Sequence, residues 1–224
     1  MGQIAHATAR ACKDWDERPL AAFPPRPYIA GAMYIETETT PNPATLKFLP
    51  QQQVMSQGTR DFASPEDAEA SPLAQALFDT GEVTGVFFGS DFVSVTKGEG
   101  AQWTDLKPQV VAILLDHFVS EAPLFHGGSA AGISVPAEET MVVETDAADA
   151  DIVDQIKDLL ETRVRPAVAG DGGDIAFRGY RDGVVHLALQ GACDGCPSAT
   201  ATLKHGIEGL LKHYVPEVVE VRAA

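Results

Sequence analysis

The chain has 224 residues, 45% of them hydrophobic, and its 32 acidic and 16 basic side chains give a formal net charge of −16. This length allows one large domain or two small ones. The negative charge repels phosphate backbones and the sequence lacks the run of about 20 apolar residues that a membrane span needs, so we expect neither nucleic acid nor a membrane among its partners.

Residues 1–32 lack the pattern of a folded element. Arg10, Lys13 and Arg18 are typical of a transit peptide, but acidic residues are interspersed with them and prolines prevent a stable amphipathic helix. We predict a disordered tail, and a start codon misassigned upstream of Met33 is one explanation for it.

Residues 33–120 are predicted to form a first domain. Strands are expected over 33–39 and 45–48, followed by a loop over 51–69. A helix that Ser71 caps and Pro72 begins comes next, and then a hairpin of strands over 83–88 and 92–96. A final helix is expected around residues 103–118, with Thr104 as its cap. The order β-β-α-β-β-α predicts an α+β fold.

Residues 121–150 are rich in glycine at first and then in alanine and acidic side chains. This composition is typical of a flexible, self-repelling linker, and we place the boundary between two small domains there.

Residues 151–224 are predicted to form a second small α+β domain, with the order α-β-β-α-β. An apolar stripe from Ile152 to Val164 indicates a helix that Pro166 stops. Asp182-Gly183 predicts the turn of a hairpin. A second helix is expected to begin at Pro197, a strand follows at 218–221, and the predicted buried stripe of that helix is Ala199, Leu203, Ile207, Leu210, Leu211 and Tyr214.

Cys193 and Cys196 form a CxxC pair that directly precedes this second helix. Backbone N–H groups and the dipole at a helix start favour the thiolate form of cysteine. The third cysteine, Cys12, lies far away in the tail and is interpreted as incidental. So few cysteines argue against a disulfide-stapled secreted domain, and we predict a reducing compartment, the cytoplasm.

The pair supplies two thiolates, so any metal site needs further ligands. Zinc requires four. His205 lies nine residues beyond Cys196, about 13 Å along a helix, and His213 is farther, so neither closes a zinc site within one chain. Zinc held between two chains of an interaction module remains one alternative.

Two other chemistries fit a CxxC pair. A thiol–disulfide oxidoreductase has such a pair at a helix start, but only one helix and one strand follow Cys196, too few to complete a thioredoxin-like fold. A [4Fe–4S] cluster needs four thiolates, which two chains related by a two-fold axis can supply. We favour the cluster, keep the oxidoreductase as the alternative, and predict no catalytic residues.

The two predicted domains resemble, in order, the N-terminal domain of Nfu proteins and the C-terminal domain of NifU. The segments that carry the resemblance are Thr39–Phe48, Arg165-Pro166, Asp171–Asp174, Gly191–Ser198 and Val215–Val218.

The resemblance implies an iron–sulfur cluster carrier or scaffold, not an enzyme. It implies a [4Fe–4S] cluster bound by Cys193 and Cys196 of two chains in a homodimer. The expected partners are upstream cluster-assembly proteins and the apo iron–sulfur proteins that receive the cluster.

Overall fold

The computed structural model describes residues 33–127, 149–193 and 197–223. These residues contain two separate hydrophobic cores, one in residues 33–127 and one in residues 149–223, which we call the N-terminal and the C-terminal domain. Both mix helices with strands, so the predicted α+β class with two domains is confirmed. The predicted tail and most of the predicted linker lie outside the described residues.

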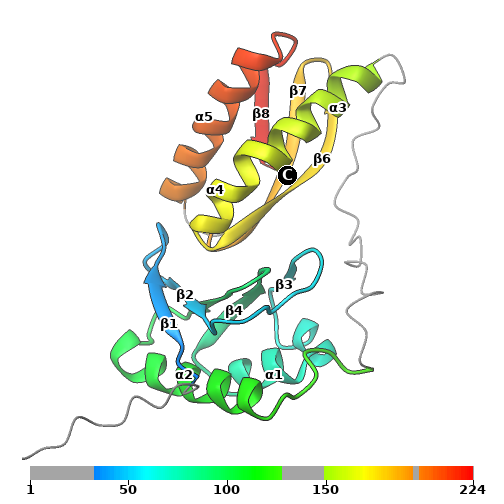
Figure 1. Cartoon of the computed structure of the whole chain (residues 1–224). Helices are drawn as coiled ribbons and strands as arrows, with labels where there is room; N and C mark the ends of the chain where they lie inside the picture. The colour runs from blue at the N-terminus through cyan, green and yellow to red at the C-terminus, as the bar shows by residue number, and fades with distance from the viewer. Residues whose placement is uncertain (1–32, 128–148, 194–196, 224) are drawn as a thin grey trace, which may run out of the picture. The chain divides into compact units, whose positions relative to one another are not determined.

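The N-terminal domain is a five-stranded antiparallel sheet of order β1-β2-β5-β4-β3 with two helices on one face (Figure 1). Its elements are β1 (Glu36–Thr39), β2 (Thr45–Leu49), β3 (Arg60–Phe62), the 3₁₀ turn η2 (Asp67–Ala70), α1 (Pro72–Phe78), β4 (Val83–Phe88), β5 (Val93–Lys97) and α2 (Trp103–Val119). Alternate strand residues such as Phe48, Val86 and Val95 pack against Leu77 and Leu114 of the helices. Successive side chains of a strand point to opposite faces of the sheet, so every second residue reaches this core.

Local signals placed most of these elements correctly. Ser71 caps α1, because its hydroxyl accepts a hydrogen bond from the Ala74 amide at 3.2 Å. The hairpin of β4 and β5 closes with a 2.9 Å bond from the Gly89 amide to the Phe92 carbonyl.

Two predictions for this domain were wrong. The expected loop over 51–69 contains β3 and most of η2. The strand β3 was not predicted because its three residues are too few to show the alternation of a strand. Thr104 is not the cap of α2: Gln102 holds that position in extended backbone, and Thr104 lies inside the helix.

The C-terminal domain is a three-stranded sheet of order β6-β7-β8 that packs with its helices around one core. The antiparallel pair β6–β7 is followed by the parallel pair β7–β8, which α5 connects. The elements are α3 (Ala150–Leu159), the π-helical segment η4 (Leu160–Val164), α4 (Arg165–Gly170), β6 (Gly173–Arg181), β7 (Val184–Gly191), α5 (Pro197–Tyr214) and β8 (Glu220–Ala223). Asp182 and Gly183 both have positive φ, as the predicted hairpin turn requires.

The first helix of this domain does not stop at Pro166, as predicted, but continues to Gly170. The π-helical segment explains the difference. Its wider turn puts the Arg165 amide on the Leu160 carbonyl, and Pro166 then stands at the start of α4, where a missing N–H costs no hydrogen bond. No helix in the described parts of the chain is long and apolar enough to cross a membrane.

Candidate functional site

Cys193 lies in the loop between β7 and α5, three residues before Cys196, whose own placement is outside the described residues. The Cys193 side chain is packed into the core of the C-terminal domain, with 5% of the residue exposed. Helix α5 starts at Pro197, directly after Cys196, as predicted. The Thr200 hydroxyl in the first turn of α5 donates a 3.1 Å hydrogen bond to the Cys193 carbonyl and ties the loop to the helix.

Two glycines form the wall beside Cys193. A Cβ on Gly173 would lie 2.9 Å from the Cys193 Sγ and 2.5 Å from the Gln190 carbonyl oxygen, so only glycine fits there. Gly191 has a φ of +66°, which favours glycine, and it pairs with Gly173 across β6 and β7. The 3.2 Å bond from the Ala192 amide to the Gly172 carbonyl completes the contact between the two segments.

The segment Asp171–Asp174 is one of those that carry the resemblance to the C-terminal domain of NifU. It is a turn, since Gly172 has a φ of +84°, and it also contacts Cys193 through Gly173. Sequence reasoning did not identify Gly173 and Gly191 as the wall of the site, because the contact joins residues about twenty positions apart.

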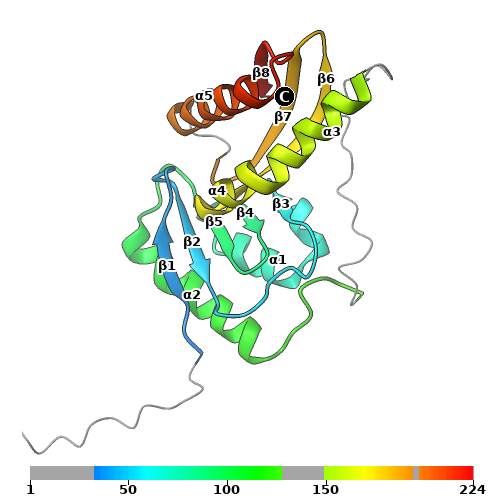
Figure 2. The same cartoon turned by 45° about the horizontal axis from the view of Figure 1, so that its top comes forward.

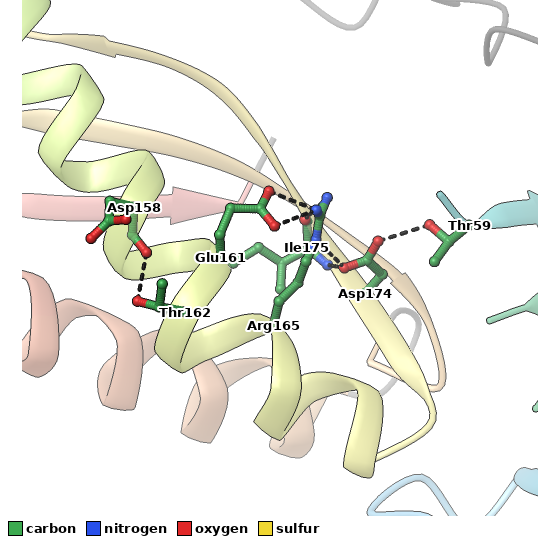
Figure 3. A network of polar contacts seen from close by, with 7 residues as sticks. All are labelled: Thr59, Asp158, Glu161, Thr162, Arg165, Asp174 and Ile175. Carbon is green, nitrogen blue, oxygen red and sulfur yellow. Dashed lines mark hydrogen bonds and ion pairs between the residues drawn. The ribbon is translucent and has the colours of Figure 1, made fainter. Parts of the chain in front are cut away.

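A network of ion pairs fixes the start of β6, which carries this wall (Figure 3). The Arg165 guanidinium donates to Asp174 Oδ1 at 2.9 Å and to both Glu161 oxygens at 2.6 and 2.8 Å. Asp174 Oδ1 also accepts a 2.7 Å bond from the Ile175 amide. Burial lowers the pKa of Arg165, but the charges and hydrogen bonds of Asp174 and Glu161 raise it more, so its pKa lies above the ordinary value and the guanidinium stays charged.

The histidines considered as zinc ligands are engaged elsewhere on α5. His205 Nδ1 donates to the Ala201 carbonyl at 2.6 Å, and the His213 ring packs edge-on against Tyr214 with centroids 4.8 Å apart. Within the described ranges, no three His, Cys, Asp or Glu side chains are grouped so that they could hold a metal ion.

One end of the predicted buried stripe on α5 is wrong. Tyr214 is 41% exposed, and its ring lies under the Arg163 guanidinium, whose Nη1 donates to the Tyr214 hydroxyl at 3.0 Å. Ile207 and Leu211 are buried as predicted, Leu203 and Leu210 only in part, and the side chain of Ala199 lies outside what the structure describes.

Comparison with known proteins gives matches to both domains. Residues 35–121 match the family model "Scaffold protein Nfu/NifU N terminal", and residues 156–222 match the "NifU-like domain". Among curated relatives, the "NFU1 iron-sulfur cluster scaffold homolog, mitochondrial" of Drosophila virilis is 40% identical over 96% of this chain and 74% of that protein. The protein of the same name from Drosophila ananassae is 46% identical over 86% of this chain and 65% of that protein.

A plant protein matches as well. "NifU-like protein 4, mitochondrial" of Arabidopsis thaliana is 47% identical over 83% of this chain and 64% of that protein. The chain thus spans just under two thirds of the length of several relatives it matches.

The predicted cytoplasmic location is contradicted by these relatives, whose names place them in mitochondria. The prediction was drawn from the scarcity of cysteine. That scarcity indicates a reducing environment and does not distinguish the compartments that share one.

Proposed function

Because the chain belongs to the Nfu/NifU family of iron–sulfur cluster scaffold proteins, we propose that it carries a [4Fe–4S] cluster and delivers it to apo-proteins. The cluster is cargo, and the chain holds it without catalysing a reaction. Upstream assembly proteins supply it, and apo iron–sulfur proteins receive it. The observation that carries the proposal is the position of Cys193, beside a glycine wall and three residues before the cysteine that precedes α5.

Cys193 and Cys196 are the proposed ligands. A [4Fe–4S] cluster takes four thiolates, and this pair supplies two. Two copies of the chain related by a two-fold axis supply all four, and the cluster then lies between them. A thiolate at the start of the 18-residue helix α5 is stabilised by the positive end of the helix dipole, which lowers the cost of holding negative ligands close together.

Such a cluster is suited to transfer. Its proposed ligands come from a loop, although the Cys193 side chain packs against the core of its domain, and each chain contributes only half of them. An acceptor that offers new thiolates can therefore replace one copy at a time. Gly173 and Gly191 allow the two strand ends to pack closely beside Cys193, which fixes the position of this proposed ligand.

Anaerobic reconstitution with iron and sulfide tests this proposal. We expect a brown dimer with about four irons per two chains, and transfer of the cluster to an apo-enzyme that requires one. Cys193→Ala and Cys196→Ala should abolish cluster binding, whereas Cys12→Ala, the matched cysteine control outside the pair, should retain it.

Three results would contradict the proposal. A colourless monomer after reconstitution would exclude the cluster. Zinc instead of iron in protein purified without oxygen would favour an interaction module held by zinc between chains. A reversible Cys193–Cys196 disulfide with catalytic turnover of a disulfide substrate would favour an oxidoreductase.

A further inference from the structure

One edge of the apolar stripe of helix α5 is only partly covered by the core of its domain. Ile207 and Leu211 are buried, but Leu203 and Leu210 are only half-buried, and Gly206 between them is exposed. These three residues, Leu203, Gly206 and Leu210, are called the α5 face below. They line a groove beside η4 and α4, which lie next to α5 in both views (Figures 1 and 2). Cys193 lines the same groove, so the α5 face is continuous with the candidate site.

Gly206 has no role in the packing of its own domain. A Cβ at this position would meet no atom within 4 Å, and its φ is not in the left-handed region. Glycine inside a helix costs about 1 kcal/mol relative to alanine. A glycine flanked by leucines on an open helix face allows another helix to approach closely.

The spacing of the α5 face is that of a helix-pairing seam. Leu203, Gly206 and Leu210 follow the three-then-four spacing of a heptad repeat. In the sequence, Cys196 lies seven residues before Leu203.

We propose that the α5 face binds the α5 face of a second copy of this chain, with the two helices parallel. This inference rests on the proposed function, which requires two more thiolates at one place. A two-fold axis that runs along the helices brings both helix starts, and so both CxxC pairs, to the same end. Antiparallel helices would separate the two starts by about the length of the 18-residue helix, roughly 27 Å, too far for ligands of one cluster.

The test compares two glycines of α5. Gly206 lies on the α5 face, and Gly209, three residues on, is exposed and is likewise a position where a Cβ would meet nothing within 4 Å. Glu is a better helix former than Gly, so Gly206→Glu and Gly209→Glu should both fold at least as well as the original chain. A melting curve of each apo-protein checks this.

In the reconstituted full chain, Gly206→Glu puts two like charges against each other across the two-fold axis. We expect its dimer dissociation constant, measured by anaerobic sedimentation, to rise about tenfold or more and its iron content to fall, while Gly209→Glu keeps both at the original values. Unchanged dimerisation of Gly206→Glu would overturn the inference and leave the proposed function standing. So would equal loss in both variants, because the contact would then not be specific to the α5 face. Failure of the unaltered chain to bind iron would instead overturn the proposed function, and the inference with it.

Discussion

At the scale of single residues, the site depends on the absence of side chains next to the thiol. Gly173 is in contact with Cys193 and Gln190, and no Cβ fits between them. The sequence shows a pair of glycines in this segment, but it does not show which of them touches the cysteine. That knowledge requires the pairing of β6 with β7, in which Gly173 faces Gly191.

Gly173→Ala should therefore damage both folding and cluster binding. The new methyl group would force Cys193 or the strand β7 to move, and overpacking of this kind typically costs about 1–3 kcal/mol. Urea unfolding should show the loss of stability, and reconstitution should give less iron per chain.

Gly170→Ala is the matched control for that variant. Gly170 ends α4 in an exposed position where a Cβ would meet nothing within 4 Å. The control should match the unaltered chain in both measurements. Equal stability of Gly173→Ala and Gly170→Ala would contradict this prediction, because it would show that the residues around Gly173 can move to admit a methyl group without loss of unfolding free energy.

At the scale of helices and strands, a buried ionisable side chain makes the stability of the N-terminal domain depend on pH. His117 near the end of α2 is 8% exposed, with its ring edge-on to Phe118 at 5.3 Å. Burial lowers the pKa of His117 below its usual value of 6.5, and the charge of Asp116 opposes this only in part. The imidazole is therefore neutral in the folded domain at neutral pH.

This shift predicts a loss of stability in mild acid. The unfolded chain binds a proton on His117 near pH 6.5, whereas the folded domain resists it to lower pH. The contribution of neutral His117 is therefore present above pH 6.5 and is lost as the pH falls below that value. In His117→Gln, the free energy of unfolding of the N-terminal domain should fall less between pH 7.5 and pH 5.5 than in the original chain.

Fluorescence of Trp103, in a Trp15→Phe background, can follow this unfolding, because Trp103 begins α2 and packs 6.5 Å from the Phe48 ring. His126→Gln serves as the control, since His126 is an exposed histidine of the same domain. If His117→Gln and His126→Gln changed the pH dependence equally, the burial of His117 would not be its cause.

The helix formed by α3, η4 and α4 is longer than its sequence predicts, because it continues past Pro166. Proline normally ends a helix because it lacks an N–H and clashes with the preceding turn. Here Pro166 follows the π-helical segment and stands in the first turn of α4, and the added turn carries the chain to the glycines of the site. Thr162 in this segment donates to the Asp158 carbonyl at 2.7 Å, which is also drawn in Figure 3.

At the scale of the whole molecule, the net charge of −16 opposes any contact between two copies. The Debye length falls from about 30 Å at 0.01 M salt to about 10 Å at 0.1 M, so salt weakens this repulsion. The cluster-loaded dimer should therefore be tighter in 300 mM sodium chloride than in 20 mM.

Anaerobic sedimentation at the two salt concentrations measures this effect. Gly206→Lys and Gly209→Lys both lower the negative charge of the chain by one, but only Gly206 lies on the α5 face. A difference between the dimer dissociation constants of the two variants therefore reports the charge on the α5 face, and a change common to both reports the overall charge. A dimer weakened by salt would show instead that attraction between opposite charges holds the two copies together.

The sequence by itself determined the features that depend on a few neighbouring residues. Ser71 and Pro72 marked the start of α1, Asp182-Gly183 marked a hairpin, and the CxxC pair before Pro197 marked the candidate site and, through its resemblance, the family. Caps, turns and helix starts are set by local dihedral preferences and hydrogen bonds, so they can be recognised without the fold.

Only the tertiary structure decided which distant residues meet. It placed Gly173 against Cys193, left Tyr214 under Arg163 rather than in the core, and left the Leu203, Gly206 and Leu210 face of α5 half-open beside the cysteine. The core covers only part of the apolar stripe of α5. The periodicity of the sequence shows that the stripe exists, but it does not show which of its residues the neighbouring elements bury. That depends on how closely the neighbouring helix approaches, because burial is a property of packed pairs of elements and not of one element alone.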